Sequence, residues 1–179
     1  RMLDYAIESG VTYIDTAYPY HDGESEPFVG RVLKKYKRED FYLATKLPMF
    51  KIDSLEQAKE IFEEQMKRLD VDYVDFYLLH ALNKDTWKKV IDLNIISYCE
   101  ELKKQGRIKN FGFSFHDDYE VFEEIINYRD WDFCQIQLNY IDTDIQAGMK
   151  GYKLTEEKNV PLVIMEPIKG GALASLSDD

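Results

Sequence analysis

The stretch "FYLATKLPMFKIDSLEQAKEIFEEQMKRLDVDYVDFYLLH", residues 41–80, carries the pattern that decides the fold. It begins with an apolar run at 41–47 and ends with another at 73–80, and each run has the length of a buried strand. Between them, Ser54 and Gln57 match a capping box, and apolar residues then recur at helical spacing as far as Leu69. The stretch therefore predicts a strand, a helix and a second strand, which is the repeating unit of a parallel sheet.

The same alternation continues along the whole chain. Apolar runs predict strands at 12–17, 41–47, 73–80, 108–114, 133–140 and 161–166. Apolar stripes at helical spacing predict helices near 2–7, 28–36, 54–69, 87–104, 122–126 and 146–158, and Gly10 and Gly106 supply stop signals for two of them. Strict alternation with short loops predicts a parallel sheet with right-handed crossovers.

Two closures fit such a sheet, an open doubly wound sheet or a closed barrel. No G-x-G-x-x-G motif follows a predicted strand, so the dinucleotide-binding form of the open sheet lacks its fingerprint. A (β/α)8 barrel usually needs about 250 residues. On the barrel interpretation, residues 1–179 form a single partial domain with about six of the eight strands, without the first strand and the last strand and helices.

The composition narrows the classes of partner. A formal net charge of −11 argues against nucleic acids and anionic membranes, because both attract basic surfaces. No apolar run is long enough to span a membrane, and no signal peptide is present. Cys99 and Cys134 lie within apolar patterns and form no C-x-x-C pair, so we expect reduced, buried thiols and a cytoplasmic protein without a metal site.

Polar residues stand at the ends of the predicted strands. Asp15, Lys46 and His80 end three successive strands, and Tyr20 follows the first of them in a loop. One charged residue at an open strand end needs no special explanation. Three in succession indicate a site, because the chemistry of a (β/α)8 barrel gathers at the carboxyl ends of its strands.

These four side chains suggest one kind of chemistry. A phenol holds its proton until about pH 10, and a nearby ammonium favours its ionised form. A carboxylate beside the ammonium keeps it charged and in place, and a neutral imidazole can share a hydrogen bond with a substrate oxygen. Such a set donates a proton to a carbonyl oxygen but supplies no electrons, so it requires a hydride donor, for which a nicotinamide is the natural candidate.

Five segments together resemble the aldo-keto reductases over essentially the whole chain. They are "DTAYPYHDGESEPFVG" (15–30), "ATKLP" (44–48), "YVDFYLLH" (73–80), "QGRIKNFGFS" (105–114) and "PLVIMEPIKGGAL" (161–173). The resemblance implies a (β/α)8 barrel that reduces aldehydes or ketones with NADPH, or alternatively NADH. It also implies that Tyr20 is the general acid, that Lys46 and Asp15 tune it, and that His80 orients the small carbonyl substrate.

The resemblance extends to the residues that hold the cofactor. It implies contacts to the nicotinamide carboxamide from two strand ends, and contacts to the nicotinamide and pyrophosphate from the last strand and loop. These residues are Ser114, Gln135, Met165, Pro167, Ile168 and Gly170. Two positions depart from many members of the family, since Phe115 replaces an asparagine and Met165 replaces a stacking tyrosine.

Several alternatives stay open at this point. The pattern is similar to that of a bacterial and archaeal branch in which some members carry a C-terminal iron–sulfur extension, although no such cysteine cluster occurs in residues 1–179. A cofactor-binding regulatory or sensor module, as among potassium-channel β subunits, is a second function, and a different barrel enzyme such as an isomerase is a weaker third. His21 and His116 are interpreted as exposed loop histidines.

Overall fold

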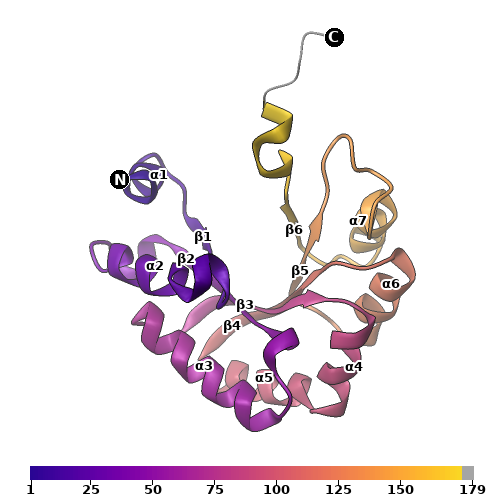
Figure 1. Cartoon of the computed structure of the whole chain (residues 1–179), viewed down its shortest axis with the longest axis horizontal. Helices are drawn as coiled ribbons and strands as arrows, with labels where there is room; N and C mark the ends of the chain where they lie inside the picture. The colour runs from indigo at the N-terminus through magenta and orange to yellow at the C-terminus, as the bar shows by residue number, and fades with distance from the viewer. Residues whose placement is uncertain (175–179) are drawn as a thin grey trace.

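Six parallel strands lie side by side in chain order and form one curled sheet in this computed structural model, which describes residues 1–174 (Figure 1). The strands are β1 (Tyr13–Asp15), β2 (Tyr42–Leu47), β3 (Val74–Leu82), β4 (Ile108–Phe115), β5 (Phe133–Gln137) and β6 (Leu162–Met165). Each strand pairs in parallel with the next one along the chain. The sheet is therefore an incomplete (β/α)8 barrel, and the predicted fold class is confirmed.

One helix precedes the first strand, and the others connect the strands along the outer side of the curl (Figure 1). The helices are α1 (Met2–Glu8), α2 (Ser25–Leu33), α3 (Leu55–Leu69), α4 (Lys84–Asp92), α5 (Ile95–Lys104), α6 (Tyr119–Tyr128) and α7 (Gly148–Glu157). Short 3-10 turns follow several strands or helices: η1 (Tyr20–Gly23), η2 (Arg38–Asp40), η3 (Met49–Lys51) and η4 (Lys169–Ala174).

The single helix predicted at 87–104 is wrong. Two helices, α4 and α5, occupy this segment. The helical conformation is interrupted at Asn94, whose φ is 55°. Asparagine tolerates this left-handed conformation better than most residues do. The first helix also starts earlier than predicted, because Asn83 caps it in a reciprocal capping box with Thr86.

The strand predicted at 133–140 is too long at its C-terminal end, since β5 ends at Gln137. The reason is local. The side-chain oxygen of Asn139 accepts hydrogen bonds from the backbone N–H groups of Ile141 and Asp142 at 3.0 and 2.8 Å, which turns the chain away from the sheet. A different strand, β3, is longer than predicted and continues two residues past the predicted end at His80, to Leu82.

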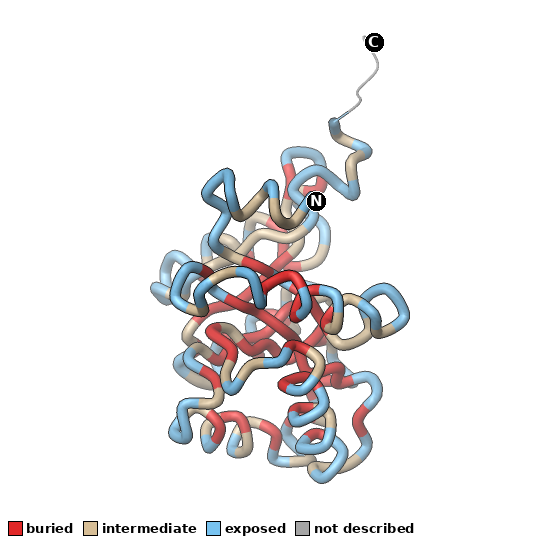
Figure 2. Tube along the Cα trace, turned by 90° about the vertical axis from the view of Figure 1, so that its left-hand side faces the viewer, coloured by how far each residue is buried: buried red, intermediate tan, exposed pale blue. Residues whose placement is uncertain are grey.

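Alternation along the strands divides the apolar residues between two faces. The outer-face side chains, such as Leu43, Tyr77 and Phe113, pack against the helices in one large core. On the inner face, Ala44, Leu78 and Phe133 form a second, smaller cluster. Figure 2 shows the buried residues concentrated along the central strands and the helix faces that cover them. Polar residues occupy the inner face at the carboxyl ends of the strands.

Both cysteines are buried free thiols, as predicted. Burial raises the pKa of the Cys134 thiol to about 12 and raises that of Cys99 still further, so both stay protonated at neutral pH. Among residues 1–174, no helix has both the length and the apolar character needed to cross a membrane.

Candidate active site

Lys46 lies at the centre of the polar inner face. Its side chain is only 1% exposed, and it projects from the carboxyl end of β2. The ammonium donates to Asp15 Oδ1, to the backbone oxygen of Thr16 at 2.9 Å and to Tyr20 Oη at 3.4 Å. Three of the four predicted catalytic side chains therefore meet at one nitrogen atom, whose three protons all have acceptors.

The loop after β1 turns back on itself and brings Tyr20 over the lysine. The turn depends on His21 and Asp22, which both adopt left-handed backbone conformations with φ of 53° and 55°. A hydrogen bond of 2.8 Å between the hydroxyls of Thr16 and Ser25 closes the loop at its base. The Tyr20 side chain is 40% exposed, so its hydroxyl touches Lys46 while the ring stays open to a ligand.

His80, at the carboxyl half of β3, completes the predicted group of four. Its ring lies edge-on to the ring of Tyr20, with centroids 5.7 Å apart. The side chain is buried, and its Nδ1 has no hydrogen-bond partner among the described residues. Burial, the Lys46 ammonium and the nearby His116 lower the pKa of His80 to about 3. The imidazole is therefore neutral at pH 7 and carries one N–H donor.

Ser114 and Gln135 lie next to each other on the same inner face. They are register partners on β4 and β5, and both are buried. Ser114 Oγ accepts a hydrogen bond from the backbone N–H of Ala81 at 2.8 Å, so its hydroxyl proton remains available. A hydroxyl donor beside a primary amide has the donor and acceptor groups that a carboxamide requires, so this pair fits the nicotinamide contacts implied by the sequence.

The remaining predicted cofactor residues lie at the far edge of the sheet from β1. Met165 ends β6 half-buried, and Pro167, Ile168 and Gly170 are exposed on the turn that follows. Gly170 has a φ of 64°, and apart from Gly170 itself and its two chain neighbours no atom of the described residues lies within 4 Å of the position a Cβ would take there. The backbone at this turn is thus open to a close approach. Within residues 1–174, no hydrogen bond or salt bridge joins this turn to the group around Lys46.

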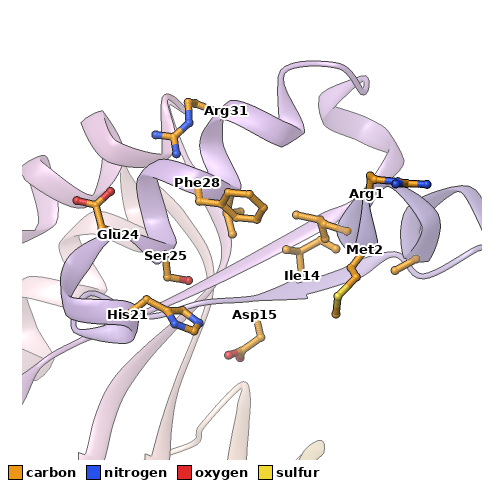
Figure 3. A pocket seen from close by; sticks show the side chains of 12 residues that line it. Arg1, Met2, Ile14, Asp15, His21, Glu24, Ser25, Phe28 and Arg31 are labelled. Atoms are coloured by element: carbon orange, nitrogen blue, oxygen red, sulfur yellow. The ribbon is translucent and has the colours of Figure 1, made fainter.

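An open cleft of about 990 Å³ is lined by residues of α1, β1 and α2 and of the loop between β1 and α2, with Asp15 among them. Figure 3 shows Asp15 and His21 at one end of this cleft and Met2 and Ile14 at the other. His21 is exposed, as predicted. Among residues 1–174, no three His, Cys, Asp or Glu side chains gather where they could hold a metal ion.

Comparison with known proteins settles the family. The chain matches the Aldo/keto reductase family over residues 1–179. It belongs to the aldo/keto reductase family. The sequence resemblance and the partial-barrel fold thus agree with an independent comparison.

This aldo/keto reductase chain has similar relatives among curated proteins and solved structures. It is 31% identical to "Uncharacterized oxidoreductase YqkF" of Bacillus subtilis (strain 168), with 96% of this chain and 56% of the relative covered. It is 25% identical to the "NADH-specific methylglyoxal reductase" of Escherichia coli (strain K12), with 96% and 57% covered. The holo form of aldo-keto reductase AKR11C1 from Bacillus halodurans superposes with a TM-score of 0.79 at 30% identity, with 99% of this chain and 60% of that one covered. The chain therefore spans a little over half the length of these relatives.

Sequence reasoning about this aldo/keto reductase missed two features of the site. His116 is half-buried rather than exposed, and its Nδ1 lies 3.2 Å from the side-chain oxygen of Gln146. Gln65 and Glu26 are completely buried behind Lys46. A signal for Gln65 existed, because it is a polar residue on the apolar stripe of α3. No pattern pointed to the environment of His116.

Proposed function

We propose that this aldo/keto reductase reduces small aldehydes or ketones to alcohols, with NADPH or NADH as the hydride donor. The main support is the contact of one buried ammonium, Lys46, with both Asp15 and Tyr20 beside the neutral His80. The name of the E. coli relative, a methylglyoxal reductase, is in keeping with a small carbonyl substrate.

Each of the four residues has a separate task in this proposal. Tyr20 donates its hydroxyl proton to the carbonyl oxygen as negative charge develops there. Lys46 lies within 3.4 Å of that hydroxyl and stabilises the phenolate that remains. Asp15 holds the ammonium charged and in place. His80 donates its single N–H to the same carbonyl oxygen and so fixes the substrate's orientation.

The cofactor residues act by holding and orienting. A bound nicotinamide supplies the hydride that reaches the carbonyl carbon. Ser114 and Gln135 hold the carboxamide through the hydroxyl proton and the amide that they present side by side. The thioether of Met165 would pack against the nicotinamide, and the turn with Pro167 and Gly170 would hold the pyrophosphate.

The substitution Tyr20→Phe tests the proposal. Loss of the proton donor should lower kcat by about 100-fold to 10,000-fold, while the Kd for NADPH stays near its wild-type value. Tyr42→Phe is a matched control, because Tyr42 is also an exposed tyrosine but begins β2 at the end away from Lys46. Its kcat should equal that of the wild type.

Two results would contradict the proposal. Turnover of Tyr20→Phe at the wild-type rate would remove the tyrosine from the chemistry. Tight NADPH binding without turnover of any aldehyde in a broad panel would instead favour the alternative function, a cofactor-binding regulatory or sensor module.

A further inference from the structure

A completely buried carboxylate lies on the opposite face of β2 from the catalytic ammonium. Glu26, in the first turn of α2, is 0% exposed. Its Oε1 accepts hydrogen bonds from Thr45 Oγ1 at 2.6 Å and from Gln65 Nε2 at 2.8 Å. Burial raises the pKa of this carboxyl, since the charged form loses its water. A group this costly to bury indicates a specific task.

Gln65 connects this carboxylate to the backbone of the lysine strand. Its Nε2 also lies 3.0 Å from the backbone oxygen of Lys46. Its Oε1 accepts a hydrogen bond of 2.8 Å from the hydroxyl of Tyr77, which is itself completely buried. The amide is thus held at both ends, and it fixes the position of Lys46 from behind the sheet.

Glu26 also holds the loop that carries the catalytic tyrosine, because it follows Tyr20 by only six residues. The guanidinium of Arg68 on α3 lies 3.4 Å from Glu26 Oε2 and 3.4 Å from the backbone oxygen of Tyr18. One residue before Glu26, Ser25 forms the hydroxyl–hydroxyl contact that closes the base of the loop. Arg68 and Gln65 therefore tie the loop and its following helix to α3, and Thr45 ties Glu26 to the strand that carries Lys46.

The loop needs such fastening because part of its backbone is strained. His21 and Asp22 follow Tyr20 directly and both have positive φ values, which cost energy for residues other than glycine. Such conformations persist only where the surrounding structure enforces them. If the anchors were released, the turn would relax and the hydroxyl of Tyr20 would leave Lys46.

We propose that Glu26 and Gln65 are positioning residues that lock the tyrosine loop to the lysine strand and so set the distance between Tyr20 Oη and Lys46 Nζ. They act through Tyr20 and Lys46 and do not touch the substrate. The inference rests on the proposed function only in that the distance matters for proton donation. A misplacement of about 1 Å in an active site can cost as much as 100-fold in rate.

The experiment compares three variants of the full-length protein. Thr45→Val removes the shortest hydrogen bond to Glu26 and nearly conserves volume. It should lower kcat by about 10-fold to 100-fold, with little change in KM for the carbonyl or in Kd for NADPH. Glu26→Ala should lower kcat by at least as large a factor. Glu26→Gln keeps an acceptor for Thr45 and Gln65, so its kcat should lie between that of Glu26→Ala and that of the wild type.

Glu63→Gln is the matched control. Glu63 lies on α3 beside this cluster in sequence, but its carboxylate is exposed and pairs with Arg107 at 3.0 Å. It should keep the wild-type kcat. If Thr45→Val and Glu26→Ala unfold at lower temperature but keep the wild-type kcat, the cluster only stabilises the fold and the inference is overturned.

A crystal structure of Thr45→Val separates this inference from the proposed function. A longer Oη–Nζ distance than the 3.4 Å of the wild type supports the positioning role, and an unchanged distance overturns it. This readout holds even if the wild type reduces no carbonyl, an outcome that refutes the proposed function alone. The Oη–Nζ distance in Thr45→Val can also be measured if Glu26→Ala fails to fold.

Discussion

Mild acid should destabilise this protein through His80. The imidazole is 8% exposed and lies close to the Lys46 ammonium, so adding a proton to it in the folded state is costly. Burial, together with Lys46 and His116, lowers its pKa from 6.5 to about 3. We therefore expect the substitution His80→Gln to change how the free energy of unfolding depends on pH.

The size and sign of the effect follow from the two pKa values. Well above pH 6.5 the imidazole is neutral in both the folded and the unfolded chain, so His80 adds no pH dependence there. As the pH falls from 6.5 towards 3, the unfolded chain binds a proton that the folded chain refuses, and stability is lost. Between pH 7 and pH 5 the loss from His80 alone is about 2 kcal/mol.

Urea unfolding at pH 7 and at pH 5, followed by circular dichroism, measures this loss. Carboxylates titrate in both proteins, so their contribution cancels when wild type and His80→Gln are compared. The wild type should lose about 2 kcal/mol more than the variant. His21→Gln, which removes an exposed histidine, is the control and should behave as the wild type does. Equal losses in wild type and His80→Gln would falsify the argument that His80 is held neutral.

Two further substitutions test the packing and the cofactor face. In Gly30→Ala, the new methyl group would lie 2.7 Å from the backbone oxygens of Arg68 and Leu69, so α2 and α3 must separate. The free energy of unfolding should fall by about 1–3 kcal/mol. An unchanged Tm would show that the two helices can move apart without loss of stability. Gln135→Leu should weaken NADPH binding by about 3-fold to 10-fold in a fluorescence titration, whereas the exposed Gln105→Leu should not. Equal Kd values for both variants would remove Gln135 from the cofactor site.

The sequence predicted the strand-end residues well because their placement follows from simple geometry. Parallel strands with period-two alternation bring every inward residue at a carboxyl end to the same rim. Asp15, Lys46 and His80 therefore had to lie near one another once the strands were recognised. The approach of Tyr20 was different. It depends on left-handed backbone at His21 and Asp22, which no hydrophobic pattern encodes and which only the resemblance to a family suggested.

The break between α4 and α5 could not be read from periodicity either. Apolar residues such as Val90 and Ile95 are buried on both sides of the break, so the stripe continues while the backbone does not. Only the conformation of Asn94 separates the two helices. Buried polar side chains such as Gln65 depend in turn on partners far apart in the chain, and no local window contains both partners.

The order of the strands has a consequence for how this protein can change. Asp15, Lys46 and His80 belong to β1–β3, whereas Ser114, Gln135 and Met165 belong to β4–β6. The proposed proton donation and the proposed cofactor contacts thus occupy separate halves of the chain, which are joined by the pairing of β3 with β4 and by the hydrogen bond from Ala81 N–H to Ser114 Oγ. We therefore expect substitutions in β5 and β6 that alter cofactor preference to leave the contacts of Lys46 with Asp15 and Tyr20 unchanged. A substitution at Ser114, which accepts the hydrogen bond from Ala81, should instead affect both halves.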